Sequence, residues 1–179
     1  MLAAAGELIE KQDVEGLTVR ELARRAKVSH NAPYRHFPDR ESVLAALAAE
    51  GFARLGKALE EAGKRDPMER GAAYVRFALE HPQRFRLMFG GVLRLDTHAG
   101  LREQASRAYE GLVRAFASLA EPRAAEITAA AAWSLVHGLA QLLLDGHFAR
   151  ATRGGRDNEA FVREVLSAVR LVARSAQPA

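Results

Sequence analysis

The sequence contains no cysteine, and it has no stretch in which β-branched residues alternate with polar ones. The missing cysteine excludes disulfides, cysteine metal sites and thiol nucleophiles, and it suits the reducing cytoplasm. The missing alternation argues against β-strands. We therefore expect an all-α cytoplasmic protein, with about nine helices to judge from its start and stop signals.

Long apolar runs are also scarce. We find no run of the roughly eighteen or more residues that a membrane span needs, because Arg123, Glu126 and Thr128 interrupt the small-residue segment before Trp133. The sequence further lacks a glycine-rich phosphate loop, a Gly-x-Ser-x-Gly elbow and a His-Glu-x-x-His helix. We therefore expect no membrane span, no enzyme and no cofactor.

Two Asp-x-His pairs raise the alternative of a metal site. Asp96 precedes His98, and Asp145 precedes His147, at the same spacing. Carboxylate and imidazole groups both suit divalent ions. Both pairs lie near expected helix ends, however, where polar residues are common for other reasons. We expect no metal site, and a metal assay on the purified protein tests this.

Positive charge is concentrated in one short segment. The whole chain has a formal net charge of +4, which by itself says little about partners. Between Thr18 and Arg40 there are two acids and six bases, and the bases are Arg20, Arg24, Arg25, Lys27, Arg35 and Arg40. A phosphate backbone would be attracted to this segment.

Capping residues and apolar periodicity predict where the helices lie. Thr18 and Glu21 form a capping box, while Ser29 and Asp39 are good N-caps for the helices that follow them. Residues 90–98 and 149–156 are expected loops. The expected helices span residues 2–12, 19–26, 30–37, 40–63, 67–80, 83–89, 99–119, 121–148 and 157–174. Two short capped helices across a tight turn, over residues 19–37, form a unit that fits the major groove.

From Leu17 to Ala46 the chain reads LTVRELARRAKVSHNAPYRHFPDRESVLAA, and this segment closely resembles the DNA-binding domain of TetR/AcrR family repressors. The matching points are Leu17-Thr18-Val19, Leu22-Ala23, Val28-Ser29, Tyr34, His36-Phe37 and Arg40. The resemblance implies a three-helix helix-turn-helix DNA-binding domain over residues 1–46. It also implies a helical effector-binding and dimerisation domain over residues 47–179. Such a repressor binds a palindromic operator as a dimer and is released by a small effector.

The resemblance further implies two sets of contacts with double-stranded operator DNA. Residues that face base edges are Arg20, His30, Asn31, Ala32 and Arg35. Residues that bind phosphate and set the register are Thr18, Ser29, Tyr34, His36 and Arg40. The chemistry agrees, because arginine pairs with guanine, asparagine pairs with adenine and a helix N-terminus attracts phosphate.

Two residues depart from the common pattern of this family. Lys27 stands where glycine usually makes the turn, so it bears a left-handed backbone cost if φ there is positive. Pro33 lies inside the expected recognition helix and costs little if it stays within the first turn. The first helix also starts abruptly at Leu2, which leaves open whether a basic arm precedes it.

The C-terminal half carries a second, shorter resemblance, to a Trp-x-x-x-His-Gly signature in one domain type of the same family. Trp133 and His137 are four residues apart and share a helix face. They are either pocket residues or a core tryptophan with a hydrogen-bonded core histidine. Gly138 beside them indicates close approach by another helix, for which a dimer partner is one candidate.

The last helix has two apolar stripes, and a monomer readily buries only one. One stripe holds Phe161, Val165, Val169 and Val172, and the other holds Val162, Leu166 and Ala173. In the family, the last two long helices pair with their copies in a four-helix bundle. We therefore expect a homodimer.

Large apolar side chains are concentrated in the middle helices, where family members hold the effector. We expect an effector pocket lined by Tyr74, Phe77, Phe85, Met88, Phe89, Tyr109, Trp133 and His137. Taken singly, each residue also fits ordinary core packing. As a set they favour a small, mostly apolar ligand. The alternative function is a helical interaction module whose DNA-binding element is inactive.

Overall fold

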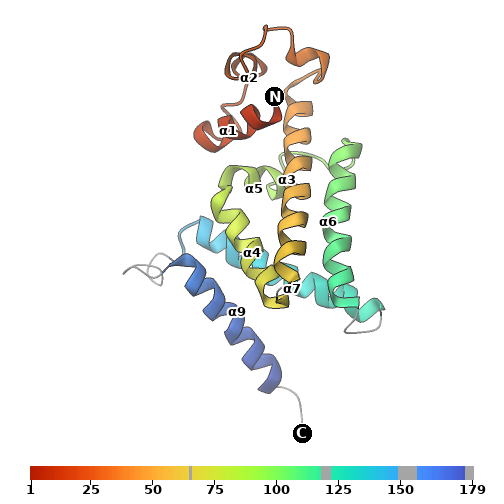
Figure 1. The fold of residues 1–179 in the computed structure, drawn as a ribbon, viewed down its shortest axis with the longest axis vertical. Helices are drawn as coiled ribbons and strands as arrows, with labels where there is room; N and C mark the ends of the chain where they lie inside the picture. The colour runs from red at the N-terminus through yellow and green to blue at the C-terminus, as the bar shows by residue number, and fades with distance from the viewer. Residues whose placement is uncertain (65, 118–121, 149–156, 176–179) are drawn as a thin grey trace. The chain divides into compact units, whose positions relative to one another are not determined.

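The structure is a computed structural model that describes residues 1–64, 66–117, 122–148 and 157–175, and the side chains of these except 67, 122 and 169–175. The described residues form eight α-helices and one short 3-10 helix, with no strand among them (Figure 1). The expected all-α fold is confirmed.

The chain forms two compact units, each built from two segments. The first unit comprises residues 1–56 and 81–111, and the second comprises residues 57–80 and 112–179. The first contains α1 (Leu2–Gln12), α2 (Val19–Arg25), the 3-10 helix η1 (Pro33–Arg35), most of α3 (Arg40–Gly63), α5 (Pro82–Phe89) and most of α6 (Ala99–Ala117). The second contains α4 (Pro67–Glu80), α7 (Pro122–Leu144) and α9 (Asn158–Ser175). The family resemblance divides the chain after residue 46 into a DNA-binding and an effector-binding domain. This division concerns function rather than compactness, and it stays a prediction.

A small apolar core holds α1, α2 and the start of α3 together. The buried residues are Ala5, Leu8 and Ile9 of α1, Val19, Leu22 and Ala23 of α2, and Val43, Leu44 and Leu47 of α3. Local capping fixes where two of these helices begin. The Thr18 hydroxyl accepts the Glu21 N–H at 3.1 Å, and the Asp39 carboxylate accepts the Ser42 N–H at 2.7 Å. The expected N-caps of α2 and α3 are therefore confirmed.

The helix expected over residues 30–37 is wrong. Residues 30–32 form a turn, and only Pro33–Arg35 are helical, in 3-10 geometry. Proline explains the difference, because position 33 is where the first intrahelical N–H after a Ser29 cap would bond back to the Ser29 carbonyl. Proline has no N–H, and Ser29 O instead accepts the Ala32 N–H at 2.9 Å. The segment therefore keeps the tighter 3-10 pattern.

Helix α6 runs beside α3 within the first unit (Figure 1). A Cβ added at Gly56 of α3 would lie 3.9 Å from Cα of Ala108 in α6. Just before α6, Nε2 of His98 lies 2.9 Å from Oε1 of Glu41 in the first turn of α3. The α3 segment in this unit thus lies close to α6 near Gly56, and its first turn contacts the residue just before α6.

Helix α5 is fixed to α1 by polar groups that the sequence pattern does not reveal. The Glu10 carboxylate accepts the N–H groups of Gln83 at 3.1 Å and Arg84 at 3.0 Å, so it caps the N-terminus of α5. Arg84 is 5% exposed, and a Cβ added at Gly6 would lie 2.2 Å from its Nη2. The guanidinium therefore occupies the space that the missing Gly6 side chain leaves.

In the second unit, α4 packs against both α7 and α9. Gly71 of α4 permits this, because an added Cβ would lie 3.0 Å from Cδ1 of Leu166 and 3.3 Å from Cγ1 of Val136. Val162 and Leu166 of α9 are buried, as expected for one of its apolar stripes. Ala173 of this stripe has a side chain outside the described residues. On the other stripe Phe161 and Val165 are half-buried, and the side chains of residues 169 and 172 lie outside the described residues.

Ion pairs reinforce the packing of α9 on α4. Arg163 of α9 binds Glu69 of α4 and also Glu159 one turn away, at 2.9 Å. Glu159 in turn lies 3.3 Å from the Arg76 guanidinium of α4. These groups are partly exposed, so we expect them to orient α9 more than to stabilise it.

Helix α7 ends earlier than the expected Phe148. Gly146 has φ +75°, its N–H bonds to Leu143 O at 3.1 Å, and the His147 N–H bonds to Leu142 O at 3.0 Å. This pair of bonds around a left-handed glycine is the Schellman motif that closes a helix. The expected loop over residues 149–156 lies outside the described residues.

Helix α7 also corrects the expectation about apolar runs. Among the described residues, one helical segment, Arg123–Leu144, is long and apolar enough to cross a membrane by length and composition alone. The charges at Arg123 and Glu126 lie at one end and leave residues 127–144 without any Asp, Glu, Lys or Arg. Much of this segment is exposed in the single chain, including Ile127 at 62% and Leu142 at 41%.

Candidate DNA interface and effector site

The residues predicted to contact DNA lie on α2, on the turn and 3-10 segment after it, and at the start of α3. Ala32 and Arg40 are half-buried. The other members of the set are exposed, namely Thr18, Arg20, Ser29, His30, Asn31, Tyr34, Arg35 and His36. The His30 and Tyr34 rings pack edge to face with centroids 6.1 Å apart, so these two side chains lie on the same part of the surface. The predicted set thus lies within residues 18–40 and is mostly exposed, and its role in DNA binding stays a prediction.

Three of the six bases in this segment already have partners within the chain. Arg24 binds the Glu21 carboxylate at 2.6 Å, and Arg25 binds the Glu7 carboxylate at 2.6 Å. These arginines lower the pKa of Glu21 and of Glu7, mainly through the hydrogen bonds that they donate. Arg40, the third, binds backbone carbonyls.

Arg40 has a structural role that its sequence motif did not reveal. Its Nε donates to Leu17 O at 2.7 Å, and its Nη2 donates to Val14 O at 2.6 Å. The side chain therefore ties the start of α3 to the loop between α1 and α2. Its predicted contact with phosphate would use the donors that remain.

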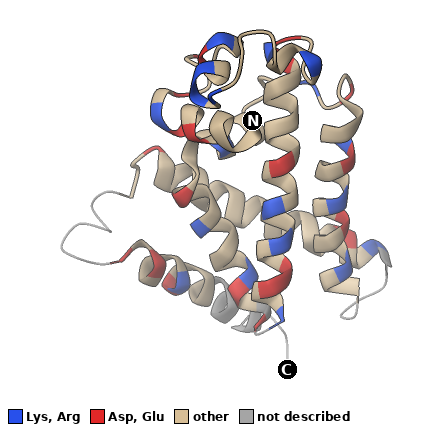
Figure 2. Cartoon of the chain, turned by 45° about the horizontal axis from the view of Figure 1, so that its top comes forward, with Lys and Arg blue, Asp and Glu red and all other residues tan. Residues whose placement is uncertain are grey.

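Among the described residues, the structure gives no ion pair to the other three bases, which are Arg20, Lys27 and Arg35. All three are exposed. Figure 2 shows several Lys and Arg positions along the segment from α2 to the start of α3. Unpaired cations on an exposed segment beside a helix-turn-helix are the groups that phosphates would meet first.

The turn after α2 has a left-handed backbone at Lys27, where glycine is usual in the family. Lys27 has φ +54°, its N–H bonds to Arg24 O at 3.2 Å, and the Val28 N–H bonds to Ala23 O at 3.1 Å. These bonds form a Schellman motif in which Lys27 holds the left-handed position. Lys27 therefore meets the condition under which the left-handed backbone cost applies.

In the second unit, three of the predicted pocket residues form a polar cluster. Nε1 of Trp133 donates to the Tyr74 hydroxyl at 3.0 Å, and that hydroxyl lies 2.9 Å from Nδ1 of His137. The hydroxyl can donate its proton to a bare Nδ1 or accept a second hydrogen bond from Nδ1–H, so the direction of this bond follows the tautomer of His137.

Burial keeps this cluster neutral. It raises the pKa of Tyr74 far above its usual value of 10.0, although the hydrogen bond from Trp133 works in the opposite direction. Burial also lowers the pKa of His137 from its usual 6.5. At neutral pH the cluster is therefore a chain of uncharged hydrogen-bonding groups inside an apolar unit.

The remaining predicted pocket residues divide between the two units. Phe77 is buried in the second unit with Tyr74. In the first unit, Phe89 packs against Phe85 with centroids 4.9 Å apart and against Phe52 at 5.2 Å. Met88 is buried there as well, whereas Tyr109 is 37% exposed. The pocket therefore stays a prediction, with the polar cluster as its best-defined part.

Three of the four side chains in the two Asp-x-His pairs have partners of their own within the chain. Asp96 binds Arg94 at 2.8 Å, His98 contacts Glu41, and Asp145 accepts from the Gln141 side chain at 3.0 Å. No group of three or more His, Asp or Glu side chains in the described part of the chain is arranged to hold a metal ion.

These features define a helix-turn-helix protein of the DNA-binding type, joined to a helical unit with a partly buried polar cluster. Two family models match the chain. Residues 1–47 match the bacterial regulatory proteins of the tetR family, and residues 68–169 match the tetracyclin repressor-like C-terminal domain. The chain belongs to the TetR family of transcription regulators.

One curated relative is a transcriptional repressor, and two solved structures share the fold. The HTH-type transcriptional repressor AcnR of Corynebacterium diphtheriae is 27% identical over 197 residues, which cover 99% of this chain and 92% of that protein. A Rhodococcus sp. RHA1 protein of unknown function has a solved structure with a TM-score of 0.74 and 34% identity, covering 94% of this chain and 88% of that one. A TetR variant from Acinetobacter baumannii AYE, solved in complex with minocycline, has a TM-score of 0.63 and 20% identity, covering 99% and 96%.

Proposed function

We propose that this chain is a cytoplasmic repressor that binds a palindromic operator as a homodimer and releases it when a small, mostly apolar effector binds. The observation that carries the DNA-binding part is the exposed segment from α2 to η1. It holds unpaired cations beside the predicted base-reading side chains. Its assignment to DNA rather than to another polyanion rests on the family.

A second copy of this chain is the partner that the exposed face of α7 fits. Ile127, Leu135 and Leu142 are exposed apolar residues on this helix, and a Cβ added at Gly138 would meet nothing within 4 Å. A glycine inside a helix costs about 1 kcal/mol relative to alanine, so a glycine that faces open space needs another reason. Close approach by the same helix of a second copy supplies one, and it would bury the apolar face.

The effector would bind in the second unit, near the cluster of Tyr74, Trp133 and His137. The minocycline complex of the Acinetobacter relative supports ligand binding by this kind of fold. The surrounding side chains are mostly apolar, and a neutral hydrogen-bonding cluster would orient a ligand without requiring it to be charged. Acyl thioesters, aromatic acids and hydrophobic drugs are the compounds to screen first.

The rival function, a helical interaction module without DNA binding, predicts a different result in one experiment. Genomic fragments that the full-length protein retains would be sequenced, and the affinity for the enriched site would be measured against salt concentration. A repressor yields a palindromic site and a steep decrease of affinity with salt, because each phosphate contact releases counterions. An interaction module yields no enriched palindrome and little dependence on salt.

A further inference from the structure

Lys27 holds a backbone position that favours glycine. It is the left-handed residue of the Schellman motif that ends α2, with φ +54°. A side chain in this conformation is strained, because Cβ comes too close to the neighbouring backbone. Only one other non-glycine residue in the described part of the chain has a positive φ, Asp13, and its carboxylate accepts the Gly16 N–H at 3.1 Å. Asp13 thus gains a local hydrogen bond from its position.

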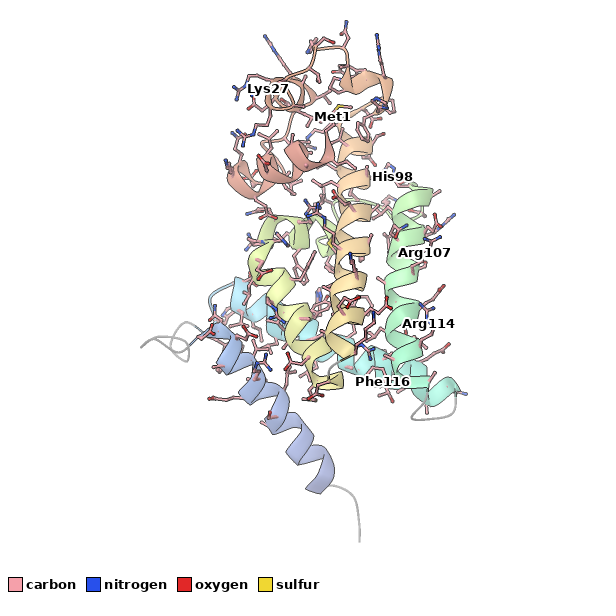
Figure 3. All side chains as sticks on the ribbon, viewed as in Figure 1. Met1, Lys27, His98, Arg107, Arg114 and Phe116 are labelled. Carbon is pink, nitrogen blue, oxygen red and sulfur yellow. The ribbon has the colours of Figure 1, made fainter. Side chains whose placement is uncertain are left out.

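Lys27 gains no comparable contact. Lys27 lies at the end of α2 (Figure 3), and its side chain is exposed. Among the described residues, its ammonium group has neither an ion pair nor a hydrogen bond. The nearby arginines Arg24 and Arg25 bind Glu21 and Glu7. The strain at Lys27 is therefore not offset by anything within the chain, and an exposed strained residue of this kind is typical of a functional surface.

The position of Lys27 indicates what its ammonium group would meet. The turn leads within two residues to Ser29, a predicted phosphate contact, and then to the predicted base-reading residues His30 and Asn31. A lysine is a compact point charge on a flexible stem, which suits phosphate oxygens and carries no base preference. The turn thus adds a cation at the edge of the surface that faces DNA.

We propose that Lys27 binds a phosphate of the operator and fixes the register of the recognition segment. This inference rests on the proposed DNA-binding function. It assigns the strained turn to one additional phosphate contact in each protomer, alongside the contacts that the family pattern already implies.

The test measures operator affinity and thermal stability for the full-length Lys27→Gly variant and for the unmodified full-length protein. Lys27→Gly removes both the charge and the backbone strain. We expect its melting temperature to rise while its operator affinity falls, by the same factor for every operator variant. The slope of log affinity against log salt should become shallower by about 0.9 for each protomer. If Lys27 had a purely structural role, thermal stability and operator affinity would both rise or both fall in Lys27→Gly.

Two further variants separate charge from backbone. Lys27→Arg keeps the charge, so we expect it to retain the slope of the unmodified protein. Lys27→Ala keeps the positive φ and loses the charge, so it should show the shallower slope without the gain in stability. As a matched control, Lys64→Ala removes a lysine already bound to Glu61 at 2.9 Å, and the slope should stay unchanged.

The outcomes distinguish this inference from the function on which it rests. If the unmodified protein binds its operator with a steep salt slope and Lys27→Gly shows the same slope and affinity, Lys27 is not a phosphate contact and the repressor assignment stands. If the unmodified protein shows no salt-dependent binding to any enriched site, both the proposed function and this contact are overturned.

Discussion

The Tyr74 hydroxyl lies 2.9 Å from Nδ1 of His137, and Trp133 donates to the same hydroxyl at 3.0 Å. Protonation of His137 would put a hydrogen on both ring nitrogens and a charge in a partly buried position, so the contact would then persist only with Nδ1–H donating to the Tyr74 oxygen. The cluster therefore connects the packing of α4 on α7 to the protonation state of one side chain.

That connection predicts how acid affects stability. Since burial lowers the pKa of His137 from its usual 6.5, the unfolded chain takes up a proton at higher pH than the folded chain does. Stability should therefore be full above about pH 6.5 and should be lost as the pH falls below it. Urea midpoints measured from pH 7.5 to pH 5 would show the decline.

His137→Asn removes this titration and retains an acceptor near the position of Nδ1. We expect the variant to lose less stability than the unmodified protein over the same pH range. The matched control is His147→Asn at an exposed histidine outside the cluster. Equal pH dependence in the unmodified protein and His137→Asn would show that His137 does not titrate in this way.

The fit of Arg84 against Gly6 predicts a coupled pair of substitutions. An added Cβ at Gly6 would lie 2.2 Å from Nη2 of Arg84, which is buried and has little room to move. Gly6→Ala should therefore destabilise the chain by about 1–3 kcal/mol, as overpacked cores do. Denaturant unfolding of the single and double variants gives the free energies.

Arg84→Met should suppress most of that cost. The change also removes a buried Nε, which lacks a hydrogen-bond partner among the described residues. It further removes the ion pair between Arg84 and Glu50, whose N–O distance is 3.4 Å. Glu50 keeps Arg54, whose Nη2 lies 2.5 Å away, so Arg84→Met alone should cost little. Additive effects of Gly6→Ala and Arg84→Met would contradict the proposed contact.

The DNA-binding surface predicts a contrast between two kinds of substitution. Asn31→Ala and Arg35→Ala should each weaken preference at one position of the half-site, by about 1–3 kcal/mol for a good two-pronged contact. Tyr34→Phe removes a hydroxyl predicted to bind phosphate and should weaken binding to all sites alike. Affinities for a panel of single-base operator variants distinguish these patterns. If all three variants lose affinity by the same factor for every operator in the panel, Asn31 and Arg35 do not read bases.

The sequence predicted best those helices whose ends carry local signals. The expected bounds of α3 and α4 are those observed, because Asp39, Gly63 and Pro67 act on their own chain neighbours. The 3-10 geometry of η1 was missed because the effect of Pro33 depends on its exact distance from the Ser29 cap. A shift of one residue decides whether a hydrogen bond is lost.

Contacts between distant segments were not predictable in the same way. Periodicity marks a buried face, but it does not say that Glu10 caps α5 or that Arg84 fills the space beside Gly6. At the candidate sites, the motif identified which residues gather on the surface. The Glu21–Arg24 pair follows from its i,i+3 spacing on α2, whereas the pairing of Arg25 with Glu7, 18 residues away, is given only by the structure.

Gly138 predicts opposite effects on the single chain and on the dimer. Because an added Cβ meets nothing within 4 Å, Gly138→Ala should stabilise α7 of the isolated chain by about 1 kcal/mol. If a second copy approaches closely there, the same methyl group should weaken dimerisation. Sedimentation across a range of concentrations measures the association, with Gly100→Ala as the control, because a Cβ added at this α6 glycine also meets nothing within 4 Å. Unchanged association in Gly138→Ala would place the dimer interface elsewhere.

The last prediction concerns induction. In the proposed mechanism the two recognition segments of a dimer must lie about 34–36 Å apart to enter successive major grooves, so a modest change in their spacing releases DNA. A ligand causes release only if it binds the DNA-free conformation more tightly, and linkage then requires operator DNA to weaken ligand binding by the same factor.

Any compound that binds the second unit should be titrated with and without operator DNA. Tyr74→Phe should lower its affinity in both titrations while leaving their ratio close to that of the unmodified protein, because Tyr74 is proposed to orient the ligand rather than to move the recognition segment. Identical affinities with and without DNA would exclude that compound as an inducer.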